Sequence, residues 1–168
     1  MNRNATSALA LLLVLTAAGC ADTRQAVAPL EATGFSRAYH HASNVPSHGV
    51  ALEGYCPVAY FAVGKPVRGK SEHAATHEGI TYHFVSAEAK TEFMKQPTKY
   101  APAYGGWCAF GMAVEDKFPV DPTQFKIVNG RLMLFLRNDG VDALDLWNAG
   151  DEQELLRKAD AHWRRVRG

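Results

Sequence analysis

The chain has 168 residues, 47% of them hydrophobic, which is enough for one domain with a substantial core. It is too short for two such domains once a leader is removed. Lys and Arg number 18 against 17 Asp and Glu, and removing Arg3 with the leader leaves 17 of each sign. This balance gives no reason to expect a nucleic acid or an acidic polymer as partner.

The first residues have the pattern of a secretory signal. Residues 1–7 are polar and carry Arg3, and residues 8–18 form an apolar run that is too short to span a bilayer. Small residues then precede Cys20, as in the bacterial lipobox, whose cysteine is acylated and becomes the new N-terminus. Ala17 stands where that motif usually has Leu. The alternative is an ordinary signal peptide that is cut nearby, with Cys20 incidental.

We therefore expect a lipoprotein signal peptide over residues 1–19 and a flexible tether over residues 20–48, which has no sustained hydrophobic period. Ala21 follows Cys20 where an Asp would resemble an inner-membrane retention signal, so the outer membrane is favoured, with the protein on its periplasmic side. Several acyl chains would attach it firmly. Three histidines near the end of the tether are expected to be solvated rather than metal-bound: His40, His41 and His48.

The domain is expected over residues 49–168. Apolar alternation around Val58 and Tyr60 predicts a first strand within Val50–Phe61, followed by a turn. Glu78 and Gly79 predict a tight turn that pairs the segment around Ala75 with the next strand. This strand is Ile80–Val85, in which Ile80, Tyr82 and Phe84 alternate with more polar positions.

A short helix and an aromatic loop follow this strand. Ser86 is placed to cap the helix, and Pro97 prevents it from continuing. A second short turn carries Tyr100 and Tyr104 into two glycines, after which the chain reaches Cys108. The loop therefore brings a thiol close to the strand that carries His83.

The rest of the domain is predicted as a second hairpin and two helices. Asn129 and Gly130 mark the hairpin turn between strands Phe125–Val128 and Arg131–Leu136. Asn138 or Asp139 is expected to cap the first helix, Gly150 to end it, and Asp151 to begin the second. We expect His162 on the surface of that last helix, and no internal repeat is visible in the sequence. The resulting fold is α+β: a small antiparallel sheet of two hairpins, a short central helix and two C-terminal helices.

Several of these segments resemble the YHS domain, a family named for a signature that here is Tyr82, His83 and Ser86. The resemblance extends from GVALEGYCPVAYF at Gly49, through PTKYAPAYGGWCAFGMA, to ADAHWRRV near the end. It implies a treble-clef-like fold. It also implies a metal-binding role, because the family is described as a heavy-metal-binding module.

Two cysteines remain in the domain, Cys56 and Cys108, and two interpretations of them stay open. A disulfide would close a loop of roughly 50 residues and stabilise the fold by about 3 to 4 kcal/mol. A metal site would instead use both thiolates with His83 or Met112 as a further donor. Such a set suits Cu(I), or another soft metal ion, better than Zn(II), which takes four ligands in structural sites.

The resemblance favours one cysteine over the other. Metal-transporter YHS domains place a cysteine after Asp-Pro-Val, whereas here Cys56 takes the place of the Asp and is followed by Pro57 and Val58. Cys108 follows Gly105, Gly106 and an aromatic residue, which is the commoner family pattern. The resemblance therefore supports Cys108 as a metal ligand more strongly than Cys56, which is specific to this chain.

The leading functional hypothesis is an envelope-anchored accessory protein that binds or buffers a soft metal such as copper. A rival hypothesis is a thiol redox protein that works through Cys108 with Cys56 as its resolving partner. A third is a disulfide-stapled module that binds another protein. No catalytic triad, phosphate loop or zinc-protease motif is present, which favours a protein that is not an enzyme.

Overall fold

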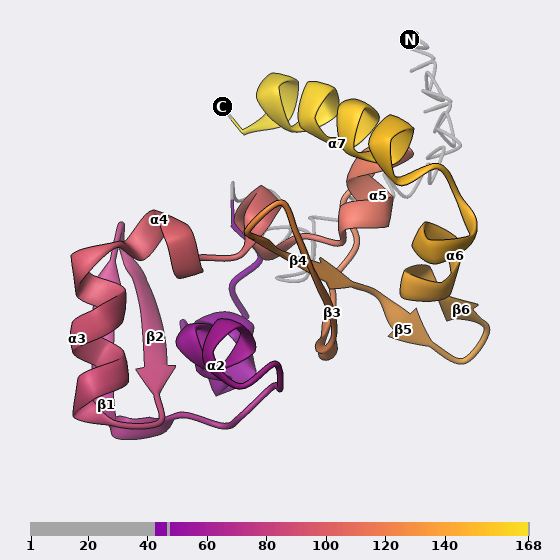
Figure 1. Cartoon of the computed structure of the whole chain (residues 1–168). Helices are drawn as coiled ribbons and strands as arrows, with labels where there is room; N and C mark the ends of the chain where they lie inside the picture. The colour runs from indigo at the N-terminus through magenta and orange to yellow at the C-terminus, as the bar shows by residue number, and fades with distance from the viewer. Residues whose placement is uncertain (1–42, 47, 168) are drawn as a thin grey trace, which may run out of the picture. The chain divides into compact units, whose positions relative to one another are not determined.

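Short helices and antiparallel hairpins alternate along the part of the chain that the computed structural model describes, residues 43–46 and 48–167 (Figure 1). This confirms the predicted α+β class. The expected signal peptide, Cys20 and most of the tether lie outside the described residues. No helix within the described ranges is both long enough and apolar enough to cross a membrane.

Three separate two-stranded sheets stand where the sequence predicted one sheet of two hairpins. The strands are β1 (Lys70–His77), β2 (Ile80–Phe84), β3 (Asp121–Val128), β4 (Arg131–Phe135), β5 (Arg137–Asn138) and β6 (Val141–Asp142). The helical elements are the 3-10 turns η1 (Ala51–Gly54) and η2 (Ala103–Gly106) and the helices α2 (Pro57–Ala62), α3 (Ala87–Lys95), α4 (Pro97–Tyr100), α5 (Ala109–Ala113), α6 (Ala143–Ala149) and α7 (Glu152–Val166). Both predicted hairpins are present, as β1–β2 and β3–β4.

The hairpin β1–β2 turns where the sequence predicts. Glu78 and Gly79 both have positive φ, 49° and 77°, as the tight turn requires. The pairing sets Ala75 opposite Tyr82. Tyr82 and Phe84 are buried, so the predicted alternation of β2 is confirmed.

Helix α3 begins and ends as its sequence predicts. The Ser86 hydroxyl oxygen accepts the N–H of Ala89 at 3.2 Å, which caps the first turn. After Lys95 the chain turns, and Pro97 begins the separate helix α4. The ring of Phe93 packs against that of Tyr82, with centroids 4.9 Å apart, so α3 covers the apolar face of β2.

The predicted first strand is wrong, because residues 57–62 form α2. Pro57 occupies the first turn of this helix, where its missing N–H has no helical partner to lose. Val58, Ala59 and Tyr60 are consecutive and all buried, as in a short helix that is covered on most sides, whereas a half-exposed strand would expose the middle residue. The alternation of apolar residues was too short to distinguish the two structures.

Strand β4 is buried on both faces. The turn of its hairpin is at Asn129 and Gly130, as predicted. Leu132 and Leu134 belong to a first apolar cluster, which β2, α2 and α3 also line. Met133 and Phe135 point to the opposite face of the strand. They belong to a second cluster, with α5, α6 and α7. One strand therefore forms part of both halves of the core.

The helix α6 is capped later than predicted. Asn138 lies in β5 rather than at a cap, and the Asp142 carboxylate accepts the N–H groups of Leu144 and Asp145, each at 3.1 Å. A short hairpin, β5–β6, occupies the intervening residues. The predicted end at Gly150 is confirmed.

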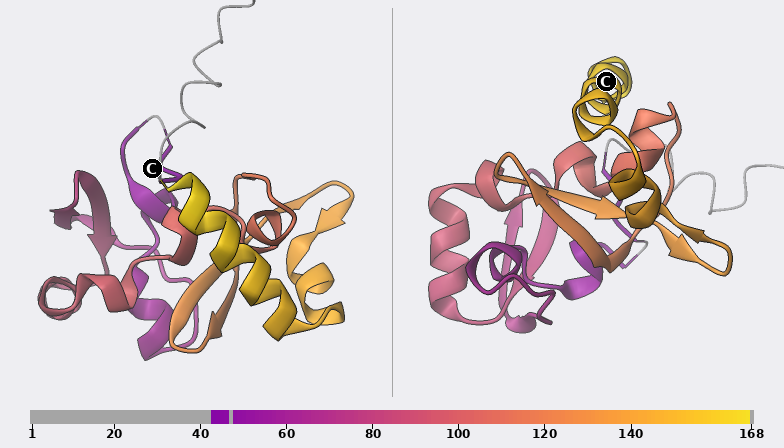
Figure 2. Two further views of the ribbon diagram at one scale, coloured as in Figure 1. Left: turned by 90° about the horizontal axis from the view of Figure 1, so that it is seen from above. Right: turned by 45° about the vertical axis from the view of Figure 1, so that its right-hand side comes forward.

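The last helix, α7, begins at Asp151 as predicted, since this carboxylate accepts the N–H groups of Gln153 and Glu154. It packs along α5 (Figure 2). The expectation that His162 lies on the surface is wrong, because its exposed fraction is 8%. His162 follows Ala159 by one helical turn and so faces the same buried side.

The structure has an internal repeat that is not visible in the sequence. The elements η1, α2, β1 and β2 recur in the same order as η2, α5, β3 and β4, displaced by 51 or 52 positions. Leu52 and Tyr104 have nearly equal positive φ, 55° and 54°, and a glycine with φ 85° ends both 3-10 turns. Each repeat then has an aromatic residue, a cysteine and a short helix.

The two hairpins of the repeat share their irregularities. In β1–β2, Lys70 pairs with Phe84, and the register then shifts before the regular pairs begin. In β3–β4, Asp121 pairs with Phe135, and the register shifts in the same region. A β-bulge is a specific feature rather than a defect. Its recurrence therefore indicates that the two segments are copies of one structural unit.

Candidate functional site

Cys108 lies at the N-cap of α5, in the second repeat, and has no exposed surface. Its sulfur accepts two backbone N–H groups, from Gly111 at 3.4 Å and from Leu136 at 3.3 Å. A Cβ at Gly111 would lie 2.8 Å from the Phe118 ring, so only glycine allows the backbone to pack this closely. Met112, which is also fully buried, belongs to the same cluster.

Two opposing effects act on the Cys108 thiol. Burial raises its pKa, because the thiolate loses solvation, while the N–H groups of Gly111 and Leu136 act in the opposite direction. Burial is the stronger of the two, so the pKa of Cys108 lies above its ordinary value and the neutral thiol is favoured. A cation close to the sulfur would reverse this balance, since thiolate is the form that binds metals.

Cys56 occupies the same place in the first repeat, at the N-cap of α2, and also has no exposed surface. Its backbone N–H donates to Val67 O at 2.8 Å, just as the Cys108 N–H donates to Phe118 O at 3.1 Å. Its sulfur, however, accepts no capping N–H. The two cysteines therefore share a backbone position and differ in the polar surroundings of the sulfur.

The four residues predicted to hold a metal do not share one cluster of the core. Cys108 and Met112 lie in the second cluster and Cys56 in the first. His83 is half-buried and lies near Gly54, where an added Cβ would be 3.5 Å from its Nδ1. Both cysteines are free thiols, and residues 43–46 and 48–167 contain no group of three or more His, Cys, Asp or Glu arranged to hold a metal.

A polar cluster that the sequence did not reveal joins β4 to α7. Both terminal guanidinium nitrogens of Arg131, Nη1 and Nη2, donate to the Asp160 carboxylate, at 3.2 and 2.8 Å. The Tyr104 hydroxyl donates to the same carboxylate at 2.9 Å, and the guanidinium lies over the Tyr104 ring, 5.0 Å from its centroid. These residues are far apart in sequence and belong to no motif, so only the fold brings them together.

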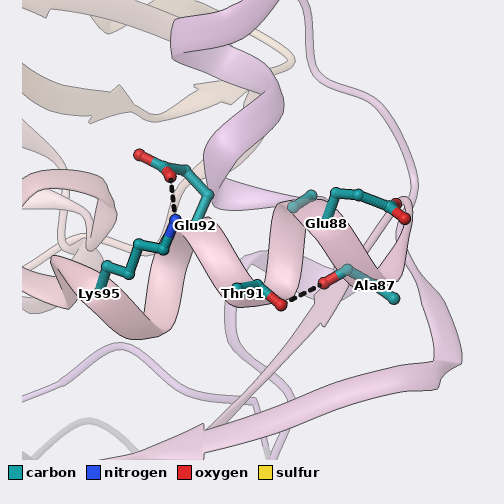
Figure 3. A pocket seen from close by; sticks show the side chains of 6 residues that line it. Ala87, Glu88, Thr91, Glu92 and Lys95 are labelled. Carbon is teal, nitrogen blue, oxygen red and sulfur yellow. Dashed lines mark hydrogen bonds and ion pairs between the residues drawn. The ribbon is translucent and has the colours of Figure 1, made fainter.

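The cluster lines a cavity of about 650 Å³ between the turn of β1–β2, the residues around η2 and the last turns of α7. A second hollow, along α3, is more open to solvent (Figure 3). One helix alone lines it, and its polar groups bond to one another: Glu92 pairs with Lys95 at 3.7 Å, and the Thr91 hydroxyl donates to Ala87 O at 2.9 Å. The α3 hollow therefore lacks the converging groups of a binding site.

No family model, curated protein or solved structure matches the chain. The resemblance to the YHS family accordingly stays a prediction from the motifs around Tyr82, His83 and Cys108.

Proposed function

We propose that the protein is an accessory protein of a bacterial envelope, anchored through an acylated Cys20, whose YHS-like domain binds a soft metal ion such as Cu(I) through Cys108. The observation that carries this proposal is the pair of N–H groups that Gly111 and Leu136 direct at the Cys108 sulfur. Hydrogen bonds to a sulfur favour its thiolate form, which is the metal ligand. The role is carriage or buffering rather than catalysis.

The donors near Cys108 fit only some metals. Met112 is the neighbouring soft donor in the same cluster, and a thiolate with a thioether suits Cu(I), which accepts few ligands. Structural Zn(II) takes four ligands, and the part of the chain that the structure describes gathers no such set. Cys56 belongs to the other cluster and His83 to neither, so this site would not include them.

Burial of Cys108 has two consequences for metal binding. The thiol must lose its proton, so affinity is expected to fall as pH falls. Since the sulfur has no exposed surface, metal reaches it only when the N-terminal end of α5 opens, and uptake is expected to be slow.

A competition titration against a Cu(I) chelator, with reductant present, tests the proposal. Cys108→Ser should weaken binding by at least about tenfold, because the substitution removes both the charge and the soft donor, while Met112→Leu should have a smaller effect. Cys56→Ser is a matched control, since it makes the same change at the equivalent position of the first repeat, and should bind as the wild type does.

Equal affinities in the wild type, Cys108→Ser and His83→Ala would contradict the proposal. Any binding would then come from adventitious donors, for which the tether histidines are the first candidates: His40, His41 and His48. A loss of binding in Cys56→Ser as large as that in Cys108→Ser would point instead to a shared site.

The two rival functions make different predictions for Cys56 and Cys108. A thiol redox protein needs an accessible thiolate, and complete burial of both sulfurs works against that role. A disulfide-stapled interaction module needs an oxidised pair that resists mild reductant. The redox state of the two cysteines in protein taken directly from the envelope separates these rivals from metal binding by free thiols.

The anchor is tested separately. Labelling cells with a clickable palmitate analogue should tag the wild type and leave Cys20→Ala unlabelled. An unlabelled wild type that is recovered in the soluble periplasmic fraction would contradict the anchor and leave the metal proposal standing. The proposal includes the membrane and a metal ion as partners, and no nucleic acid.

A further inference from the structure

The cavity beside η2 has the size and position of a ligand site. Its volume of about 650 Å³ falls within the range of small-molecule pockets. It lies where the two repeats meet, since the first contributes the turn of β1–β2 and the second contributes η2 and the start of β4. It contains none of the four residues of the predicted metal site.

Arginines dominate the charges of this cavity. Three of them line it, Arg131, Arg164 and Arg167, against two carboxylates, Glu78 and Asp160. The Asp160 carboxylate is already engaged by Arg131, and the nearest partner of Glu78 is His77, at 3.9 Å. The cavity therefore has an excess of positive charge.

Two of the arginines form no hydrogen bond or ion pair within the described residues, although the charge of Arg164 helps to lower the pKa of Asp160. These two are Arg164 and Arg167, whereas Arg157 pairs with Glu154 on the same helix, and Arg165 pairs with Glu115. Arg164 and Arg167 are three residues apart, so they lie on one face of the end of α7. Basic residues that only complement the dipole at the end of a helix need not share a face or line a cavity. The position of these two arginines is therefore better explained by a ligand.

Arg131 is held ready to bind a further group. Asp160 uses two of its five N–H donors and, with the Tyr104 ring, fixes the plane of the guanidinium. A planar guanidinium with free donors suits a carboxylate or phosphate oxygen pair. Its orientation is set before any ligand arrives, which reduces the ordering cost of binding.

Three aromatic side chains also line the cavity, among smaller residues. They are Tyr82, Tyr104 and Trp163, and the rings of Tyr104 and Trp163 meet edge to face with centroids 6.2 Å apart. Aromatic walls favour a flat apolar group, while the arginines favour an anion. The ligand chemistry that satisfies both is a ring that carries a carboxylate or a phosphate.

We propose that this cavity binds a small organic anion, with its charged group between Arg131, Arg164 and Arg167 and its flat part against Tyr104 and Trp163. The proposal is independent of the metal site. Phenyl phosphate, inorganic phosphate and phenol are the probes, because they present the ring and the anion together, the anion alone and the ring alone.

The test is isothermal titration of the purified full chain with each probe. Phenyl phosphate should bind saturably and more tightly than inorganic phosphate, and phenol should bind weakest. Arg164→Gln should weaken phenyl phosphate binding by about tenfold, since it removes one charge-assisted hydrogen bond. Arg165→Gln removes the same charge from the same helical turn outside the cavity, and should change the affinity by less than about twofold.

Two outcomes would overturn the proposal. One is the absence of saturable binding of phenyl phosphate at millimolar concentration. The other is equal weakening by Arg164→Gln and Arg165→Gln, which would show a diffuse attraction to the basic end of α7 rather than a site. Circular dichroism spectra that match the wild type would establish that each variant is folded.

Discussion

Cys56 and Cys108 occupy the same position in two successive copies of one structural unit. Each caps a short helix, and each donates its backbone N–H to a carbonyl about ten residues further along, Val67 O and Phe118 O. Only the Cys108 sulfur accepts N–H groups in return. Cys56 and Cys108 therefore share a backbone position, but only the Cys108 sulfur has polar surroundings.

Both thiols should be unreactive in the folded protein. Neither sulfur has exposed surface, and burial raises the pKa of Cys108, so an aromatic disulfide reagent at pH 7 to 8, near neutrality, should modify them only after denaturant is added. Val63→Cys supplies the control, because this side chain is 60% exposed and should react at once in the native state. Rapid modification of Cys108 in native protein would show that α5 opens readily.

Replacing Gly69 by Ala should destabilise the domain strongly. A Cβ there would overlap the carbonyl group of His83 and lie 2.7 Å from the Phe84 nitrogen, which are backbone atoms that cannot move aside. We expect a loss of about 3 kcal/mol in the free energy of unfolding, measured by urea denaturation. Gly79→Ala is the comparison, since its Cβ meets open space and only the positive φ is unfavourable, at about 1 kcal/mol. Equal losses would contradict the close approach.

The Asp160 carboxylate should contribute stability that disappears in acid. Burial alone would raise its pKa, but hydrogen bonds from Arg131 and Tyr104 prevail and hold the pKa below its usual range. The contribution is therefore complete above the unfolded-state pKa of about 4 and is lost as pH falls through the lower folded-state value.

Asp160→Asn should accordingly lower stability by about 1 to 2 kcal/mol at pH 7, a modest figure because solvent screens a side chain that is over one third exposed. The difference from wild type should shrink as pH falls toward 2 in a urea series. Asp139→Asn, at an exposed position, should show no such trend. A difference that does not change with pH would mean that packing, rather than charge, explains the loss.

The two faces of β4 should unfold together. Leu134→Ala and Met133→Ala each remove a buried side chain, from the first and the second cluster respectively, and each should cost about 2 to 5 kcal/mol. Because one strand serves both clusters, thermal unfolding followed by circular dichroism and by tryptophan fluorescence should give one shared transition in either variant. Ile127→Ala, at a partly exposed position of β3, should cost much less. Two separated transitions would show that the clusters are independent.

Local signals in the sequence predicted the elements that local chemistry decides. The turns at Glu78 and Asn129 need positive φ, and the caps at Ser86 and Asp151 need a side-chain oxygen, so residue type alone identified them. The strand predicted around Val58 was wrong because so short an alternation of apolar residues is equally compatible with one turn of a helix. The predicted cap at Asn138 or Asp139 failed because the hairpin β5–β6 delays α6 to Asp142.

Residue types alone did not predict the structural repeat or the cavity. ALEGYC and AYGGWC share only A, G and C at matching positions, with an aromatic residue before the cysteine, so the common backbone is clear mainly from its dihedral angles and register. Likewise, Tyr104, Arg131 and Asp160 meet only after α7 has packed across the second repeat. The candidate metal donors could be named from the sequence, but their division between two clusters could not.

The position of β4 has a consequence for the order in which the domain can be completed. The first repeat needs Leu132 and Leu134 to close its apolar cluster, yet these residues come some thirty positions after Tyr100, the last residue that the first part of the chain contributes to that cluster. Because the chain is synthesised from its N-terminus, the first apolar cluster stays incomplete until β4 has been made. During synthesis, the first repeat is therefore expected to stay exposed to chaperones and proteases until the second hairpin has followed it.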